Sequence, residues 1–583
     1  MEQPAPKMII EGKTVLGIRG DKSGVVKITL PRWIDTIGTK AFYECAELTS
    51  LTLPATLTCV DDSTFFSCRG LTSLKLPEAL THVGCGAFHN CNGLTTLEIP
   101  DKLKNINDYA FASCTGLTSL KLPKTITNIS ESAFAGCTGL TMLVVPESST
   151  NIASGAFCGC SGLNSVTLPE NLSTIGKNAF WGCTGLASVT LPKKLESVGS
   201  EAFYRCSKLT SLTLPDKLRL IGCKAFSYCS GLTSLKIPDT VTSLSSQAFS
   251  FCSELTSLTL SCTLTNVGAE TFSHCSNITS LIIPESLTCL GAEAFSHCGG
   301  LTSLSLPHTF TNVDCGAFSF CNGLTSLVLP ESVTIVGIEA FAFCSGITAL
   351  ALPSSLEIID QYAFHCCSEL TSLELPKKLR TIGEHAFWGC SGITSLTLPN
   401  TITNVSESTF SGCAGLTSLT LPGTLKRIGD KAFAECTRLT SLTLPDTLKS
   451  IGENAFYHCA SITCVKLPGR LERVGAHAFA FCTQLTSIEL PNSLIIVGSE
   501  AFGHCDNLAS VVFRPGLSRE AFIAWAVGSM RNRTNWQATS VKYFGEVMRC
   551  ITGFATERRD VSTVDPDGRK QVFKYCMHLH NER

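Results

Sequence analysis

The chain has 583 residues, a formal net charge of −2, 44% hydrophobic residues and 16% charged ones. A net charge this small gives no bulk attraction to nucleic acid or to anionic membranes. No apolar run approaches the roughly 18 residues that a membrane-spanning helix needs, so the sequence predicts no membrane span.

The first residues precede any repeat and predict a hairpin. Met8–Ile10 and Val15–Ile18 are short apolar runs on either side of a turn at Gly12. A hairpin over residues 1–27 would cover the exposed edge and the apolar core of a first repeat. This stretch has no apolar segment of about 7–15 residues of the kind found in signal peptides, so we expect a cytoplasmic, intracellular protein. The nucleus and the cell surface stay open as alternatives.

A phenylalanine then returns every 23 residues from Phe42 to Phe502, and all 21 of these positions hold Phe. A fixed period of about 20–50 residues predicts stacked repeats, each of which contacts only its neighbours. The sequence therefore predicts a β-rich solenoid of 21 repeats over residues 28–513, with parallel strands stacked along it. The rings of the Phe column should stack at about the strand spacing of 4.8 Å.

Each repeat is predicted to hold two short strands and a turn. In the stretch from Leu48 to Gly70, Leu51 and Leu53 alternate with hydroxyl residues, which is the period of a strand with one buried face. Proline follows, as Pro54 does here, in 20 of the 21 repeats, and it ends the strand because it has no N–H. The turn after the second apolar pair holds Gly in 13 repeats but Ala or Ser in others, so it does not strictly require a positive φ.

The frame L-x-x-L-x-L of Leu48, Leu51 and Leu53 resembles that of the leucine-rich repeats. More narrowly, LPEALTHVGCGAFHNC (76–91) and LPDTLKSIGENAFYHC (444–459) are similar to the BspA-like class, whose frame is LP-x-x-L-x-x-IG-x-x-AF-x-x-C. The resemblance covers all the repeats and implies a leucine-rich repeat fold. Bacterial members of the class are typically secreted or surface adhesins, so the resemblance also implies a possible adhesive role.

Of the 32 cysteines, 21 form one column, three residues after each Phe, from Cys45 to Cys505. A strict column in a solenoid predicts a stack of buried, reduced thiols, whereas disulfide frameworks have irregular spacings. We expect no metal site. His274 and His297 each precede a column cysteine, but their spacing does not supply the four ligands of a tetrahedral zinc site, and neither does the adjacent pair Cys366–Cys367. A closer cluster lies near the C-terminus: Cys576, His578 and His580.

Two surfaces are candidates for binding. The first-strand face is a monotonous array of hydroxyls such as Ser50 and Thr52, which we interpret as a ladder that bonds itself and water, with weak contact to a repetitive partner or ice binding as alternatives. The residue just before the column cysteine is aromatic or histidine in six consecutive repeats: Tyr228, Phe251, His274, His297, Phe320 and Phe343. In register these side chains predict a stripe, which either packs as a partly buried ladder or recruits a protein partner.

After Val512 the repeat frame ends. We expect residues 514–583 to form a small, mostly helical module, with one helix from Ser518, a second over Val541–Ile551 and a hairpin at the turn Asp565–Gly568. The module has 12 Lys and Arg against 7 Asp and Glu, yet it carries no nucleic-acid-binding motif. Capping the last repeat or docking a partner is the simpler role for it.

The sequence contains no phosphate loop, no nucleophile elbow and no H-E-x-x-H motif. We therefore expect no catalysis, no cofactor and no small-molecule substrate. The sequence predicts a non-enzymatic scaffold for protein–protein interaction. The alternative is a surface or secreted adhesive structural protein, exported by an unrecognised route.

Overall fold

The computed structural model describes residues 7–20, 22 and 24–513. These residues form 44 short strands, β1 to β44, and no helix. Each 23-residue repeat is one coil of a β-solenoid, as the period predicts, with about 21 coils in all. No described residue belongs to a helix long and apolar enough to cross a membrane. The helices and hairpin that the sequence predicts within 514–583 lie outside the described residues.

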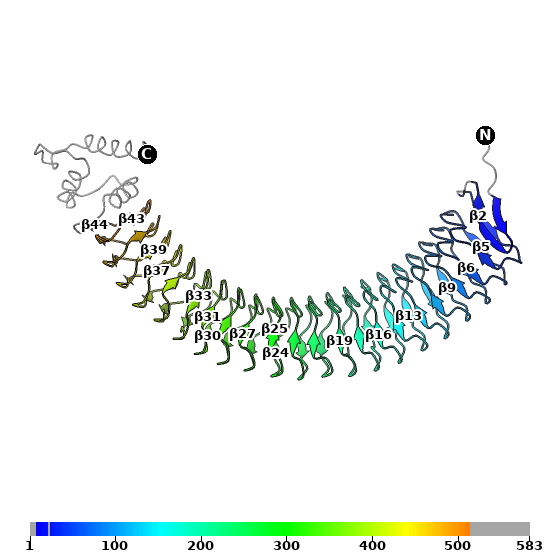
Figure 1. Ribbon diagram of the computed structural model, residues 1–583, viewed down its shortest axis with the longest axis horizontal. Helices are drawn as coiled ribbons and strands as arrows, with labels where there is room; N and C mark the ends of the chain where they lie inside the picture. Colours follow the sequence, from blue (N-terminus) through cyan, green and yellow to red (C-terminus); the bar gives the residue numbers. More distant parts are fainter. Residues whose placement is uncertain (1–6, 21, 23, 514–583) are drawn as a thin grey trace, which may run out of the picture. The chain divides into compact units, whose positions relative to one another are not determined.

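Tertiary contacts divide the chain into two compact units, unit 1 over Met1–Leu324 and unit 2 over Thr325–Arg583. The sequence does not mark this boundary because the 23-residue frame continues across it. Within unit 1, successive strands such as β9 (Thr96–Glu98), β13 (Met142–Val144) and β16 (Thr174–Ile175) follow one another along the stack (Figure 1). The predicted division of the chain at residues 27 and 513 stays a prediction.

Unit 1 begins with an antiparallel hairpin of β1 (Lys7–Glu11) and β2 (Thr14–Arg19). Gly12 lies in its turn with φ +57°, a left-handed conformation that glycine adopts without steric cost. The second hairpin strand then pairs in parallel with β4 (Thr36–Ile37). The hairpin is thus continuous with the first sheet of the solenoid.

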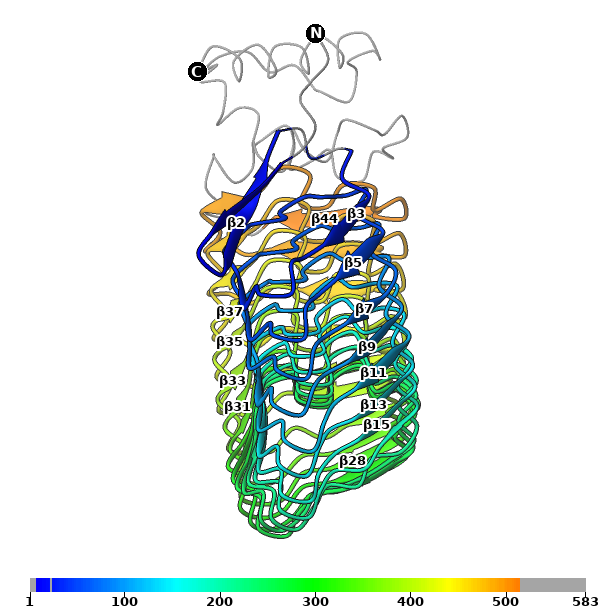
Figure 2. The same cartoon turned by 90° about the vertical axis from the view of Figure 1, so that its right-hand side faces the viewer.

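The first side of a coil is a strand of two to four residues that ends before the proline, except in the coil of Ser211, which has only an isolated bridge to Ser188. In unit 1, β3 (Lys27–Thr29) pairs in parallel with β5 (Ser50–Thr52), and β20 (Ser234–Lys236) pairs with β22 (Ser257–Thr259). In unit 2, β40 (Cys464–Lys466) pairs in the same way with β42 (Ser487–Leu490). Each residue faces the one 23 positions further on, so equivalent residues stack in columns. Figure 2 shows β3 and β5 on one side of unit 1 and β2 on the other.

The second side of each coil is a two-residue strand whose second residue is buried. In unit 1, β6 (Cys59–Val60) and β8 (His82–Val83) continue the sheet that begins with the hairpin, in the order β1-β2-β4-β6-β8. In unit 2, β35 (Asn404–Val405), β37 (Arg427–Ile428) and β39 (Ser450–Ile451) form the corresponding parallel ladder. The outward residue of each pair is half-buried or exposed and is the one that varies between coils.

The core of each unit is a set of buried columns, of which the Phe column is the largest. The rings from Phe42 onward are buried, and their centroids lie 5.2–5.7 Å apart with nearly parallel planes. The predicted ladder of rings is therefore present, with a spacing somewhat wider than that of the strands. Such offset stacks contribute about 0.5–1.5 kcal/mol per pair beyond the burial of apolar area.

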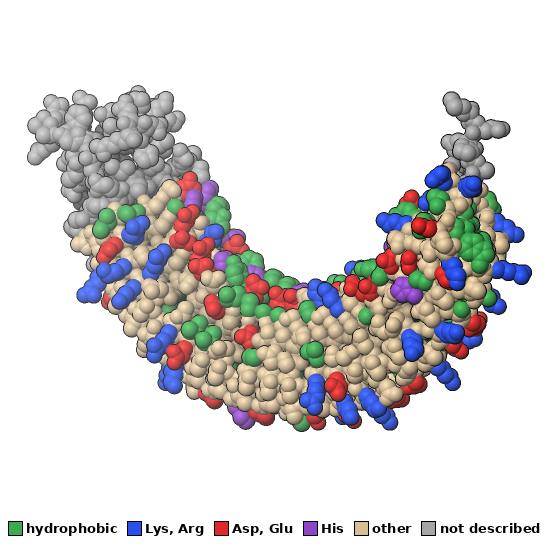
Figure 3. Space-filling view, turned by 45° about the vertical axis from the view of Figure 1, so that its right-hand side comes forward, with side chains coloured by type: hydrophobic (Ala, Val, Ile, Leu, Met, Phe, Trp, Pro, Cys, Tyr) green, Lys and Arg blue, Asp and Glu red, His purple; other side chains and the backbone are tan. Residues whose placement is uncertain are grey.

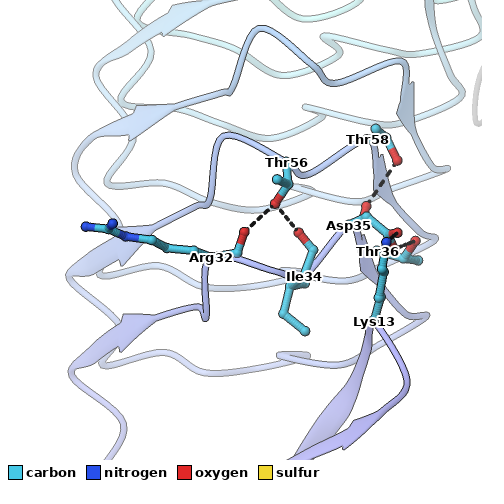
Figure 4. Close-up of polar contacts among 7 residues, drawn as sticks. All are labelled: Lys13, Arg32, Ile34, Asp35, Thr36, Thr56 and Thr58. Carbon is cyan, nitrogen blue, oxygen red and sulfur yellow. Dashed lines mark hydrogen bonds and ion pairs between the residues drawn. The ribbon is translucent and has the colours of Figure 1, made fainter.

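Hydroxyl side chains bond carbonyl groups in the turns of the preceding coil. Thr56 Oγ1 donates to the carbonyl oxygens of Arg32 and Ile34, at 2.7 Å each (Figure 4). Thr240 Oγ1 makes the equivalent bond to Leu218 O at 2.6 Å. A hydroxyl two residues after the proline thus satisfies backbone acceptors that no strand pairs.

The glycine of the second turn allows a close approach between coils. An ideal Cβ on Gly84 would lie 2.5 Å from the backbone nitrogen of Asp62 in the preceding coil, far inside van der Waals contact. Gly84 does not have a positive φ. The prediction that this turn requires no left-handed conformation is confirmed, because the glycine is present for space and not for its φ.

Candidate functional site

The third side of each coil, between the second strand and the next first strand, carries the predicted stripe. In one coil of unit 1, the N–H groups of Gln247, Phe249 and Phe251 donate to carbonyl oxygens of the next coil at 2.8–2.9 Å. Gln247 and Phe251 have φ values of +58° and +59°, whereas the residue between them contributes its ring to the core. Because of this alternation, the side chain of Phe251 lies at the surface, beside the buried Phe column.

Five of the six predicted stripe residues stack on one another in unit 1. The ring centroids lie 4.3 Å apart for Tyr228 and Phe251, and 4.2 Å apart for Phe251 and His274. The next two distances are 4.0 Å, from His274 to His297, and 4.2 Å, from His297 to Phe320. The planes of neighbouring rings differ by 5–21°, so the rings form one continuous stack.

All five of these side chains are half-buried. The sixth stripe residue, Phe343, belongs to unit 2, where its side chain is 37% exposed. Its ring lies edge-on to that of His365, with centroids 4.9 Å apart. Because the rings stack face to face in unit 1, their edges are the parts left for solvent or for a partner.

The backbone at the stripe is in the left-handed region, with φ between +59° and +62° at all six residues. The same conformation occurs in other coils whatever the side chain, for example at Ser67, Asn90 and Gly136. The left-handed conformation costs an L-residue about 1–2 kcal/mol, a cost that glycine avoids and asparagine reduces. The fold therefore does not require aromatic residues in this column, and the run of aromatic residues needs another explanation.

The stack continues towards the N-terminus through three residues that the sequence analysis did not single out. Tyr204 lies edge-on to Tyr228 with centroids 5.4 Å apart, and Trp181 stacks on Tyr204 at 5.9 Å. The guanidinium of Arg205 lies 5.5 Å and 5.6 Å from the centroids of the two tyrosine rings. Trp, Tyr and Arg are the residue types most enriched at energetic hot spots of protein interfaces.

The two histidines of the stripe are biased towards the neutral form. Burial lowers the pKa of His274, and the charge of Glu270 partly opposes this effect. Burial also lowers the pKa of His297, where the neighbouring imidazole lowers it further and Glu293 opposes both. At neutral pH the stripe therefore presents uncharged rings along its length.

The column cysteines have a structural environment. The thiol of Cys160 donates to the carbonyl oxygen of Phe134 at 3.2 Å, and the thiol of Cys229 donates to that of Phe203 at 3.3 Å. Burial raises the pKa of both thiols to about 12. These groups are therefore protonated and shielded, so they are poor nucleophiles and poor metal ligands. The described cysteines form no disulfide bonds.

The first-strand face differs from the expectation of a ladder that bonds itself. The exposed hydroxyls of Ser119, Ser165 and Ser188 make no side-chain hydrogen bond to any described residue. The ladder that does bond itself lies one residue earlier, where Thr118 Oγ1 donates to Thr95 O at 3.1 Å. The first-strand face therefore offers few groups that could select a partner. Figure 3 shows another side of the repeats, on which backbone and uncharged polar side chains also cover much of the surface.

Among the described residues, the other histidines and cysteines that the sequence analysis considered as metal ligands are not gathered into one group. His274 and His297 stack ring on ring, while Cys366 is half-buried and Cys367 is buried. The cluster formed by Cys576, His578 and His580 lies outside the described residues.

Comparisons with known proteins place this geometry among repeat proteins. A family model described as a BspA type leucine rich repeat region matches the chain in six overlapping copies, over residues 21–141, 81–210, 127–249, 196–325, 288–417 and 404–522. No curated protein matches the chain significantly.

Solved structures of leucine-rich repeat proteins are similar to this chain. One from Bacteroides ovatus is 21% identical, with 92% of this chain and 99% of that chain covered at a TM-score of 0.30. A leucine-rich cell surface protein from Faecalibacterium prausnitzii is 23% identical, with 67% and 91% covered at a TM-score of 0.28. The pneumococcal vaccine antigen PcpA is 19% identical, with 64% and 89% covered at a TM-score of 0.36.

Proposed function

The chain belongs to the BspA-type leucine-rich repeat family, and on that premise we propose that it is a non-enzymatic scaffold for protein–protein interaction. We define the aromatic stripe of unit 1 as the five stacked residues Tyr228, Phe251, His274, His297 and Phe320. The stripe is the surface through which the scaffold captures its partner.

The observation that carries this proposal is that aromatic residues occupy positions whose backbone conformation disfavours them. The stripe holds aromatic rings where the coil imposes a left-handed φ and where other coils place Ser, Asn or Gly. Stacking offsets part of that cost, but a shorter polar side chain would avoid it altogether. A binding role explains why half-buried rings are gathered in consecutive coils.

The chemistry of the stripe indicates what kind of partner it suits. Ring edges carry partial positive charge, and Arg205 at one end carries a full one. The strip formed by Trp181, Tyr204 and the stripe would thus take an apolar side chain together with carbonyl or carboxylate oxygens. An extended peptide segment with alternating apolar and acidic residues has these groups.

The test is affinity capture from the native host, followed by mass spectrometry. Full-length protein, residues 1–513 and residues 514–583 serve as baits, each beside the double variant Phe251→Ser/Phe320→Ser where it applies. We expect a partner to follow residues 1–513 and to be captured at least about 30-fold less by the double variant, because a single aromatic anchor contributes about 2 kcal/mol or more.

The matched control is Phe481→Ser. Phe481 occupies the same column in unit 2, has φ +61° and stacks on His504 at 4.3 Å, but it lies outside the stripe. Equal loss of capture in control and double variant would contradict the role of the stripe. Partners that follow residues 514–583 would make that segment the working part, with the repeats as a spacer.

An exported adhesive structural protein is the second candidate, and the column thiols are compatible with both. Buried, hydrogen-bonded thiols resist oxidation in any compartment, so they do not decide the location. The informative thiols are the exposed ones: Cys85, Cys262, Cys289, Cys315 and Cys464. Cell fractionation combined with labelling of these thiols separates the two candidates. Reduced thiols in a cytoplasmic fraction support the intracellular scaffold, and oxidised thiols at the surface support the adhesin.

A further inference from the structure

Three side chains with metal-binding atoms meet on the second-strand ladder near the start of unit 1. Cys59 in β6 faces His82 in β8 in parallel register, so their Cα atoms are neighbours across the ladder. Asp61 follows Cys59 by two residues and points to the same outer face, because alternate strand residues share a face. The buried residue between them, Val60, anchors the strand to the core.

The ligand atoms of these residues are already gathered. The Cys59 sulfur, an Asp61 carboxylate oxygen and an imidazole nitrogen of His82 all lie within 4.8 Å of one another. The sulfur lies 3.1 Å from Asp61 Oδ1, to which it donates a hydrogen bond. Ligands at about 2.0–2.3 Å from a tetrahedral ion lie roughly 3.3–3.8 Å from one another, so small side-chain rotations would complete the site.

The surroundings favour a cation. The carboxylates of Asp61, Asp35 and Asp62 all place negative charge near Cys59. Asp35 lies in the preceding coil, where its carboxylate accepts a hydrogen bond from Thr36 and pairs with Lys13 at 3.7 Å (Figure 4). A bound cation would displace the thiol proton to solvent and bring positive charge to a place where carboxylates converge.

We propose that Cys59, Asp61 and His82 bind one divalent transition-metal ion of the zinc type, with the fourth coordination position open to water. Thiolate, imidazole and carboxylate are the ligand set that zinc takes in proteins, and three protein ligands with an open position is a common arrangement. The ion would tie β6 to β8 and so staple two adjacent coils beside the N-terminal hairpin.

The repeat itself does not dictate this ligand set. At the equivalent positions most coils carry Asn, Ser or Thr in place of Cys59 and His82, and Gly in place of Asp61. Cys289 occupies the same column as Cys59, but Gly291 follows it by two residues, and it pairs in register with Asn266. Among the described residues, this is the one cluster of three such side chains with gathered ligand atoms.

The experiment is titration of the purified, reduced full chain with cobalt(II), which replaces zinc and reports a thiolate ligand by a near-ultraviolet charge-transfer band. We expect one cobalt ion per chain to give this band and zinc to abolish it by competition. Cys59→Ser should remove the band. Asp61→Asn and His82→Asn should each weaken binding by roughly 10- to 100-fold or more, since even outer-shell changes cost that much.

The variants are chosen from the repeats, so each should fold. Each substitution copies a residue that another coil holds at the same position: Ser197 for Cys59→Ser, Asn107 for Asp61→Asn and Asn105 for His82→Asn. Cys289→Ser is the matched control for a surface thiol, and Cys576→Ser controls for the C-terminal cluster. Both controls should keep the band.

Hydrogen exchange provides a second readout that is independent of the spectrum. Zinc should slow exchange in β6 and β8 of the wild-type chain and leave β23 (Asn266–Val267) unchanged. Absence of a cobalt band in the wild-type chain would overturn the proposal. So would a band that survives Cys59→Ser or disappears with Cys576→Ser.

Discussion

Phe249 and Phe251 are two residues apart in one turn of unit 1, yet their rings belong to different stacks. The first ring is buried, and it lies 5.3 Å and 5.6 Å from the rings of Phe226 and Phe272. The second is half-buried and lies 4.2–4.3 Å from its neighbours. The buried column holds Phe in all 21 repeats, whereas the outer column also holds Ser, Asn, Gly, Glu and Arg.

The difference shows where a repeat protein of this kind can carry specific function. The buried column is constrained by packing, since each ring must fit between two identical neighbours. The outer column is constrained only in its backbone conformation, so its residues are free to vary from coil to coil. A run of similar, sterically disfavoured residues in that column therefore marks a requirement other than folding.

The largest expected effect on stability comes from removing one ring from the buried Phe column. Phe249→Ala should destabilise its coil and the two adjacent coils by about 3–5 kcal/mol, because the cavity between two rings cannot close. Hydrogen exchange followed by mass spectrometry would detect faster exchange around this residue. If Phe249→Ala speeds hydrogen exchange no more than Phe251→Ser does, the buried and the outer columns do not differ in their contribution to stability.

The next effect concerns the thiol beside the buried ring. Cys160→Ala should cost about 1–2 kcal/mol, because it removes the hydrogen bond to Phe134 O and leaves a small cavity. The measurement is again local hydrogen exchange, with Cys85→Ala at an exposed site as the control. A cost no larger than that of the control would show that the column cysteines can be replaced by any small residue.

A smaller effect on stability is expected in the aromatic stripe. Phe251→Ser should change the local free energy of unfolding by less than about 1 kcal/mol, since lost stacking and relief of the left-handed conformation act in opposite directions. Loss of partner capture without loss of hydrogen-exchange protection would separate binding from folding. Unfolding of the coil by this single change would show that the stripe is packing and would remove the argument for function.

The smallest effect is that of pH on the two stacked histidines. Burial lowers the pKa of His274 and His297 in the folded state, so the unfolded chain binds their protons more readily. The stability that they contribute is present above the ordinary pKa of about 6.5 and is lost as the pH falls through the lower folded values. The hydrogen-exchange protection of these coils, measured relative to the intrinsic exchange rate at each pH, should therefore fall below about pH 6.5, and His297→Phe should reduce the change. Identical pH profiles for wild type and variant would contradict this.

Most of the fold could be predicted because a fixed period places equivalent residues in register. The parallel strands, the ladder of rings and the buried thiols all follow from positions that recur every 23 residues, whereas the N-terminal hairpin follows from two apolar runs on either side of a glycine turn. The stripe was found in the same way, as one column read down the repeats. The self-bonding hydroxyl ladder was assigned to the wrong column, since the sequence does not show whether a hydroxyl can reach a carbonyl of the preceding coil.

The features that the sequence analysis missed are formed by residues from different columns of the repeat. Trp181, Tyr204 and Arg205 continue the aromatic surface, but the first two lie one residue before the stripe position, and the third is a cation in the coil just before the aromatic run begins. Cys59 and His82 stand 23 residues apart, which is a signal that could have been used, but Asp61 lies in a third position. Only the local geometry shows that these side chains meet.

The sequence by itself determined that the chain stacks coils, which residues fill the core and which columns are free to vary. It could do so because equivalent residues of nearly identical coils must stack in register. The tertiary structure decided which free columns lie side by side at the surface. That depends on the left-handed turns between the second and the first strands, which aim each side chain and which no periodicity of residue types encodes.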